Sequence, residues 1–180
     1  MTDYYYKCLP KRIYQNGEYT LQAIQPEHVE KIRIWRNAQI DVLRQKEQIL
    51  PNDQIEYFKN NVWPEMENKK PKNILLAYTM NRKLIGYGGL VHISWSNYSA
   101  ESSFILDNKI DHHSEKYNLY IKNFFLMLKI LAFNELKFLK ITSETFNNRK
   151  RHIQLLEEIG FKKLPISSEA NSVFHELLAE

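Results

Sequence analysis

The sequence has a single cysteine, Cys8, among 180 residues, so it has no internal disulfide. It also has no cluster of cysteine and histidine with the spacing of zinc ligands. The adjacent His112 and His113 do not make one, because neighbouring side chains point apart and no third ligand is near in the sequence. We therefore expect no metal, and the scarcity of cysteine fits a reducing, cytoplasmic location.

Long apolar runs are missing as well. The first residues lack the apolar core of a signal peptide, and no run approaches the ~20 apolar residues that cross a bilayer. The formal net charge is only +4, from 25 basic and 21 acidic residues that are scattered along the chain. A nucleic-acid binder usually carries a dedicated basic face. We expect neither a membrane nor a nucleic acid as a partner.

The remaining composition is that of an ordinary globular chain, with 43% apolar and 13% aromatic residues. A chain of this length buries roughly 70% of the surface that its unfolded form exposes. The sequence therefore predicts a single domain over residues 1–180, in which residues 1–16 form a loose N-terminal arm.

The centre of the chain has the pattern of an antiparallel meander. Three runs rich in aliphatic, aromatic and β-branched residues are separated by three or four polar turn formers, and these runs are 74–80, 84–95 and 100–106. The second run contains glycines that indicate a bulge or a close backbone approach, rather than a phosphate loop, at positions Gly86, Gly88 and Gly89. Further strands are predicted over 19–24, 138–146 and 173–178.

Helical patterns precede and follow the meander. Pro26 suits the first turn of a helix that ends at Asn37, and Pro51 begins a second helix that ends at Trp63-Pro64. After the meander, Ser114 can cap a helix whose apolar residues recur at spacings of four and three, namely Tyr117, Ile121, Phe124, Leu128 and Leu131. A last helix ends at Gly160.

In this order of elements the sequence resembles the GNAT superfamily of N-acetyltransferases, which move an acetyl group from acetyl-CoA to an amine. The resemblance covers about residues 19–165 and is carried by the motifs Ile34-Trp35-Arg36-Asn37, Leu84-Ile85-Gly86-Tyr87-Gly88-Gly89-Leu90, Ala100-Glu101-Ser102-Ser103-Phe104-Ile105-Leu106 and Leu155-Leu156-Glu157-Glu158-Ile159-Gly160-Phe161. It is most similar to the branch of ribosomal-protein N-terminal acetyltransferases and amino-sugar acetyltransferases. The implied fold is α/β (α+β), a mixed, mostly antiparallel sheet of six to seven strands with helices on both faces. The fourth and fifth strands, 100–106 and 138–146, are expected to splay apart.

The resemblance implies acetyl-CoA as cofactor. Its pantetheine arm would pair with backbone groups freed by the splay, supplied by Ile105 and Leu106. Its phosphates would lie near the starts of the two following helices, against His113, Ser114, Lys116, Asn147, Asn148 and Arg149.

Direct acetyl transfer needs a base for the amine and an acid for the leaving thiolate. Glu101, on the splayed strand, is the first choice of base, with a salt-bridged strand glutamate as the plain alternative. His92 is the second choice, with a packing role as its alternative. The acid would be one of four hydroxyls, Tyr117, Tyr120, Ser143 or Tyr57, because the family's tyrosine position is Leu156 here.

The acceptor is expected to be the amine of a small molecule, such as an amino-sugar nucleotide, bound by a monomer or homodimer. Four side chains could line its pocket, namely Trp35, Arg36, Trp95 and Tyr98, although core packing is an alternative for both tryptophans. Two other functions stay open. One is acetylation of a protein N-terminus. The other is a catalytically silent binding domain, since the loop 111–117 contains none of the glycines usual in the family.

Overall fold

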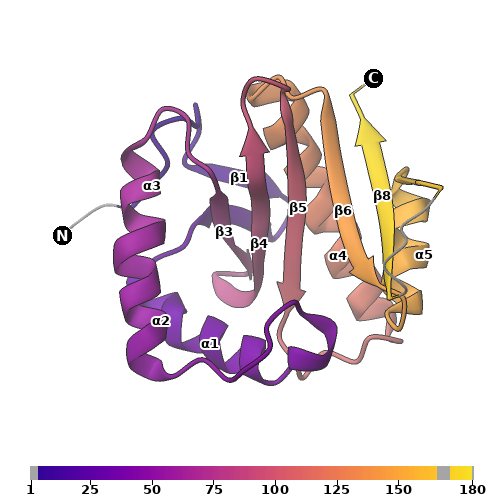
Figure 1. Ribbon diagram of the computed structural model, residues 1–180, viewed down its shortest axis with the longest axis horizontal. Coiled ribbons are helices and arrows are strands. Elements are labelled where there is room, and N and C mark those ends of the chain that lie inside the picture. The colour runs from indigo at the N-terminus through magenta and orange to yellow at the C-terminus, as the bar shows by residue number, and fades with distance from the viewer. Residues whose placement is uncertain (1–3, 166–170, 180) are drawn as a thin grey trace.

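Eight strands form one sheet in the computed structural model, which describes residues 4–165 and 171–179. Their order across the sheet is β1-β2-β3-β4-β5-β6-β8-β7 (Figure 1). The strands are β1 (Ile13–Asn16), β2 (Tyr19–Ala23), β3 (Ile74–Met80), β4 (Lys83–Ser94), β5 (Ser99–Leu106), β6 (Lys140–Phe146), β7 (Lys162–Lys163) and β8 (Ser172–Leu178). The mixed, mostly antiparallel sheet confirms the predicted fold class, with β1 and β7 added to the strands that the sequence predicted.

The junction between β5 and β6 sets the architecture of the site. It is the parallel pair of the described sheet, and its ladder covers only the pairs Ser99 with Lys140, Ala100 with Ile141 and Glu101 with Thr142. Ser102 Oγ still donates to the carbonyl of Thr142 at 3.1 Å, and beyond Ser102 β5 runs on to Leu106 without a ladder to β6. Figure 1 shows the two strands adjacent at one end and divergent at the other. The predicted splay is thus confirmed, and "the splay" below means this gap.

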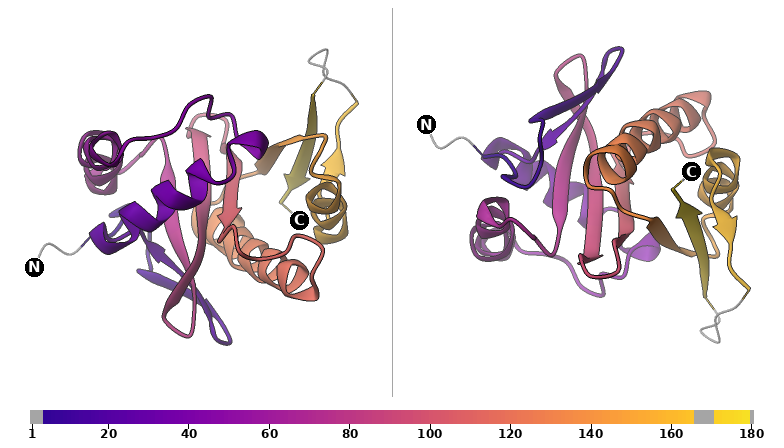
Figure 2. Two further views of the ribbon diagram at one scale, coloured as in Figure 1. Left: turned by 90° about the horizontal axis from the view of Figure 1, so that it is seen from below. Right: turned by 90° about the horizontal axis from the view of Figure 1, so that it is seen from above.

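Helices lie on both faces of the sheet (Figure 2). On one face, α1 (Val29–Asn37), preceded by the 3-10 turn Pro26–His28, packs against β5 and against α2 (Pro51–Tyr57). On the other, α4 (Glu115–Lys129) packs against β1, β2 and α5 (Lys150–Ile159). A short 3-10 turn, Ile40–Val42, lies in the loop that joins α1 to α2.

The long apolar stripe of α4 is the centre of the core. Ser114 caps the helix, because its Oγ accepts the N–H of Tyr117 at 3.1 Å. All five stripe residues predicted for this helix are buried, namely Tyr117, Ile121, Phe124, Leu128 and Leu131. After Lys129 the helix continues as a π turn, Ile130–Glu135.

The β4 glycines are sites of close backbone approach, as predicted. A Cβ on Gly88 would lie 2.1 Å from the carbonyl oxygen of Ser103 and 2.9 Å from the ring of Phe124. Gly89 has a φ of +142°, and a Cβ there would lie 2.0 Å from the carbonyl oxygen of Ile74. Only glycine lets β3, β4 and β5 lie this close together.

Two expectations for the N-terminal third are corrected. Residues 4–16 are not a loose arm: Tyr6 is buried and its hydroxyl accepts the N–H of Leu75 at 2.8 Å, and β1 pairs with β2. The second helix does not end at Trp63-Pro64, because a π turn (Phe58–Val62) leads into α3 (Trp63–Glu67). Pro64 lies in the first turn of α3, where its missing N–H is not needed.

Candidate active site

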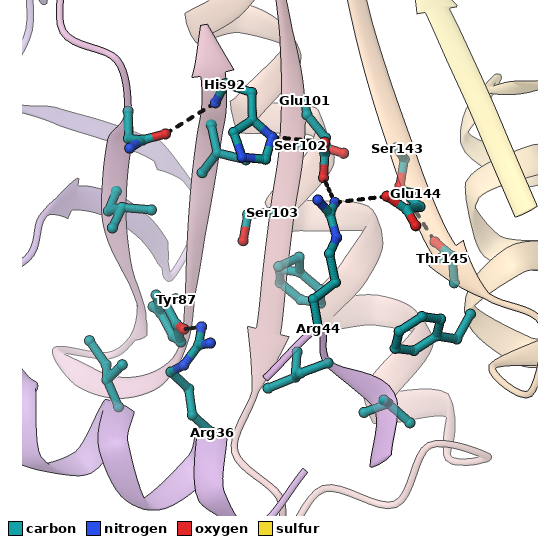
Figure 3. Close-up of a pocket in the computed structure, with 18 of the residues that line it drawn as sticks. Arg36, Arg44, Tyr87, His92, Glu101, Ser102, Ser103, Ser143, Glu144 and Thr145 are labelled. Carbon is teal, nitrogen blue, oxygen red and sulfur yellow. Dashed lines mark hydrogen bonds and ion pairs between the residues drawn. The ribbon is translucent and has the colours of Figure 1, made fainter. Parts of the chain in front are cut away.

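A cavity of about 570 Å³ opens at the splay. Its walls come from α1, the α1–α2 loop, α2, the strands β3 to β6 and the start of α5 (Figure 3). Apolar side chains such as Leu75 and Phe104 line it together with charged groups. This combination is typical of a pocket for an organic ligand.

Glu101 lies at the centre of a charged network in this cavity. One carboxylate oxygen pairs with the guanidinium of Arg44, which also contacts Glu144 Oε2 at 3.2 Å. The other oxygen lies 3.0 Å from Nδ1 of His92. Figure 3 shows Arg44 reaching from the α1–α2 loop to carboxylates on both splayed strands. The two predicted bases, Glu101 and His92, are therefore in contact, and Arg44 bridges the splay beside them.

Backbone alternation determines which β5 groups face the splay. The N–H of Asp107 donates to the carbonyl of Ile85 on β4 at 2.9 Å, so odd-numbered residues of β5 point their backbone groups towards β4. The backbone N–H and C=O groups of Phe104 and Leu106 therefore face the gap, whereas those of Ile105 face β4. Of the two residues predicted to contact the pantetheine arm, Leu106 turns its backbone groups towards the gap and Ile105 turns its own towards β4. The carbonyl of Leu106 accepts Gln39 Nε2 at 2.9 Å.

Of the four residues predicted to line the pocket for the acceptor amine, Arg36 lines the cavity. Its Nε donates to Gln45 Oε1 at 3.0 Å and its Nη1 to the hydroxyl of Tyr87 at 2.8 Å. Both partners are neutral. Burial raises the pKa of Tyr87, which keeps this phenol protonated, although the nearby Arg36 charge opposes the shift. The charge of Arg36 thus has no carboxylate partner among the described residues.

The other three residues predicted to line the acceptor pocket lie outside the cavity. Trp35 is buried in the core on the inner face of α1. Trp95 donates its Nε1 to the carbonyl of Pro71 and packs edge-on against Phe138. Tyr98 is half exposed in the β4–β5 turn. None of the three lines the cavity, because the meander places the end of β4 away from the open side of the splay.

The four predicted proton donors separate into two groups. Tyr57 and Ser143 line the cavity, whereas Tyr117 and Tyr120 do not. The hydroxyl of Tyr117 is buried 3.3 Å from Nδ1 of His152, which does line the cavity. Burial, reinforced by the charge of Arg149, holds the pKa of His152 well below its usual range, so this imidazole is neutral near pH 7. Leu156 is fully buried.

The predicted phosphate contacts gather near the starts of α4 and α5. His113, Asn148 and Arg149 line a second cavity of about 180 Å³, next to the cap residue Ser114. The ammonium of Lys116 lies over the ring of Tyr120, 5.6 Å from its centroid, and does not line this cavity. Asn147 is exposed and donates its N–H to the carbonyl of Asn171.

Several residues of the site were missed from the sequence. Arg44 and Gln39 come from a stretch with no clear periodicity, and Glu144 looked like one more residue of an alternating strand. A signal for His152 did exist, since it lies four residues before Leu156 on the buried side of the last helix.

Among residues 4–165 and 171–179, no three His, Cys, Asp or Glu side chains are grouped closely enough to hold a metal ion. In that same part of the chain, no helix has the length and hydropathy needed to span a bilayer.

Comparison with protein families gives one assignment. Residues 21–178 match the family model described as an acetyltransferase (GNAT) domain. No curated protein matches the sequence.

Solved structures match the fold over most of the chain. Spermidine N-acetyltransferase from Vibrio cholerae, in complex with CoA and spermine, has a TM-score of 0.77 at 17% identity, covering 91% of this chain and 96% of that one. A dodecameric structure of the same enzyme has a TM-score of 0.71 at 18% identity, covering 91% and 95%. A ribosomal L7/L12 alpha-N-protein acetyltransferase in complex with coenzyme A has a TM-score of 0.74 at 9% identity, covering 93% and 98%. At these identities the likeness concerns the fold.

Proposed function

The chain belongs to the GNAT acetyltransferase family and is an N-acetyltransferase that uses acetyl-CoA, and on this premise we propose that it acetylates the primary amine of a small molecule directly, inside the splay cavity. The observation that carries the proposal is the early end of the β5–β6 ladder at Glu101 and Thr142, beside a cavity of about 570 Å³. No enzyme nucleophile is needed, because both reactants can occupy one cavity.

The residues of the splay fit this cosubstrate. Acetyl-CoA supplies an acetyl group activated as a thioester. The backbone groups of Phe104 and the N–H of Leu106 face the gap and can pair with an extended, amide-bearing arm, as an added strand would, whereas the carbonyl of Leu106 already accepts Gln39 Nε2. Arg149 lines the cavity and has a buried Nε without a hydrogen-bond partner among the described residues, which suits an anionic group.

We assign the role of base to Glu101 and His92 together. If Nδ1–H of His92 donates to Glu101 Oε2, Nε2 of His92 carries the lone pair that can take the amine proton. Glu101 then fixes the tautomer and orientation of the ring and stabilises its positive charge. Arg44 holds the other carboxylate oxygen in place.

We assign the acid role to Tyr57. Of the hydroxyls that line the cavity, Ser143 and Tyr57, the phenol is the stronger acid. Tyr57 lies at the end of α2, and its side chain is partly exposed, so bulk water can restore its proton after each turnover.

The acceptor that the cavity favours carries an anionic group besides its amine. Arg36 donates only to neutral partners and can take a bidentate anion such as a phosphate or carboxylate. The ammonium end would then lie at Glu101. An amino-sugar nucleotide meets both conditions, in keeping with the amino-sugar branch. The spermine complex of the Vibrio cholerae enzyme supports a polyamine instead.

The test has two stages. Calorimetric titration with acetyl-CoA comes first, and we expect saturable binding with one site per chain. Release of the free thiol is then measured with a panel of an amino-sugar phosphate, an amino-sugar nucleotide, spermidine and a peptide with a free N-terminus. The highest kcat/KM is expected for a phosphorylated amine. Absence of acetyl-CoA binding at millimolar concentration would favour the catalytically silent domain and remove the proposal.

The acceptor assignment has its own variant. Arg36→Met should raise KM for the phosphorylated amine on the order of 10-fold to 100-fold, as loss of a hydrogen-bonded charge does, and leave acetyl-CoA binding unchanged. Arg82→Met is the control, because Arg82 lies in the exposed β3–β4 turn. Preference for spermidine or for the peptide would overturn the phosphorylated acceptor while keeping the acetyl transfer. The cytoplasmic location and the monomeric or dimeric state stay predictions.

A further inference from the structure

Two backbone donors of the loop before α4, the N–H groups of His113 and Ser114, are already in use within that loop. Asp111 accepts the N–H of His113 on its Oδ1 at 2.9 Å, and its carbonyl accepts the N–H of Ser114 at 3.1 Å. The N–H of Tyr117 donates to Ser114 Oγ. A diphosphate arriving at this loop would have to displace a carboxylate of like charge. The loop, which has no glycine, is therefore a poor anion site.

A better candidate lies next to it, between the starts of α4 and α5. The second cavity, of about 180 Å³ and called the basic cavity below, is lined by residues 148–152 together with His112, His113 and Tyr117. No aspartate or glutamate is among these lining residues. Three consecutive basic residues, Arg149, Lys150 and Arg151, contribute the positive charge. The ten-residue helix α5 also begins here, so its dipole adds to the favourable potential.

Arg149 is the central residue of the basic cavity. Its Nε is buried and has no hydrogen-bond partner among the residues that the structure describes. A buried charged donor without an acceptor is costly, so the arrangement is suited to a bound anion. Burial raises the pKa of Tyr117, and the charge of the Arg149 guanidinium lowers it in the opposite direction. The guanidinium charge therefore lies close to the Tyr117 hydroxyl.

Two other groups that line the cavity, Arg151 and His112, contribute little free positive charge. Arg151 is engaged, since its Nε donates to Asn118 Oδ1 at 2.9 Å and its Nη1 lies 3.3 Å from Glu158. His112 stacks on Tyr117 at 4.8 Å, and burial lowers the pKa of His112, so the ring is neutral near pH 7. Arg149 and the exposed Lys150 therefore supply the charge that remains available at the cavity, and of the two it is Arg149 that has a buried donor without a partner among the described residues.

The two cavities meet at Arg149 and His152, which line both of them. A long molecule with an anionic group at one end and a reactive group at the other can therefore reach from the basic cavity into the splay. This continuity links the anion site to the proposed acetyl transfer.

We propose that the basic cavity binds the diphosphate of the cosubstrate through the side chain of Arg149, in place of the backbone N–H groups of the 111–114 loop. The inference rests on the proposed function, because acetyl-CoA is the source of the diphosphate. It assigns the anion to the side chain of the residue that caps α5, so a single substitution can remove the site.

Binding of inorganic pyrophosphate and of acetyl-CoA, measured separately by calorimetry, tests the assignment without turnover. Arg149→Gln should weaken both by about 30-fold, as expected for lost hydrogen bonds to a charged group. Arg149→Lys should weaken them less, because the charge stays and only the planar fork is lost. Lys83→Gln makes the same change in charge at an exposed residue that lines neither cavity, and should bind like the unchanged protein.

A second variant separates the loop from the side chain. Asp111→Ala frees the N–H of His113, and circular dichroism verifies that each variant is folded. Binding that tightens in Asp111→Ala, or that is unchanged in Arg149→Gln, would overturn the proposal in favour of the loop. The proposed function has an independent readout, namely acetyl-CoA binding to the unchanged protein, so it can stand when the Arg149 assignment fails.

Discussion

The Nδ1 atom of His92 lies 3.0 Å from Oε2 of Glu101, across two neighbouring strands. In a regular ladder this contact would not form, because Val91 is the partner of Glu101 and the next residue points to the other face. The register of β4 and β5 shifts between Val91 and Ser94, and His92 has a φ of +49°. This bulge turns the imidazole towards the carboxylate, as bulges near active sites often do.

The first prediction concerns proton transfer at this pair. Glu101→Gln should lower kcat by about 100-fold or more, because the ring of His92 loses the anion that orients it and stabilises its charge. The affinity for acetyl-CoA, measured by calorimetry, should not change. Glu144→Gln is the matched control, since it loses the same partner, Arg44, without touching His92. An equal loss of kcat in Glu101→Gln and Glu144→Gln would assign the effect to Arg44 instead.

The second prediction concerns the proton returned to the leaving thiol. Tyr57→Phe removes only the phenolic hydroxyl from the wall of the cavity. We expect kcat to fall by about 10-fold to 100-fold with KM for the amine nearly constant. Tyr98→Phe, a change at an exposed turn residue, serves as the control in the same thiol-release assay. A Tyr57→Phe variant with full kcat would return the acid role to Ser143 or to water.

The third prediction compares two glycines. In Gly88→Ala the new methyl group would lie 2.1 Å from a backbone oxygen that β4 and β5 hold in place. We expect the free energy of unfolding to fall by about 3 kcal/mol or more. In Gly17→Ala the methyl group meets no atom within 4 Å, and only the φ of +58° is unfavourable. That change should cost about 1 kcal/mol. Urea denaturation measures the free energy of unfolding of both variants. Similar losses in Gly88→Ala and Gly17→Ala would contradict the close approach of β4 and β5 at Gly88.

The fourth prediction is a loss of stability in mild acid. Burial, together with the charge of Arg149, lowers the pKa of His152 well below the unfolded value of 6.5. Below pH 6.5 the unfolded chain binds a proton that the folded one excludes, so the free energy of unfolding falls as the pH falls. One such group contributes up to about 1.4 kcal/mol per pH unit.

The variant that checks this assignment is His152→Leu, which replaces the ring by an apolar side chain of similar size. Denaturant midpoints between pH 7.5 and 5 should depend less on pH in His152→Leu than in the unchanged protein. His175 is also fully buried, and burial lowers its pKa, so part of the dependence should remain. Identical slopes in both proteins would exclude His152 as the titrating group.

Much of the fold was readable from local patterns. The stripe from Tyr117 to Leu131, the cap at Ser114 and the stop at Gly160 are encoded within a few residues of one another, and all appear in the structure. The limits of the N-terminal region were not readable. Tyr6 looks like part of a polar tail until Leu75, 69 residues later, provides its partner.

The sequence alone determined most of the elements of this protein, their order and the family, because periodicity, capping and glycine placement act over short stretches of chain; β1, β7 and α3 were not predicted. The sequence also predicted Glu101, His92 and Arg36 as candidate site residues. Only the tertiary structure decided which groups lie in contact. The bulge after Val91 joins His92 to Glu101, the α1–α2 loop brings in Arg44, and the divergence of β5 from β6 leaves backbone groups free. Such contacts depend on packing between distant segments, which no local pattern records.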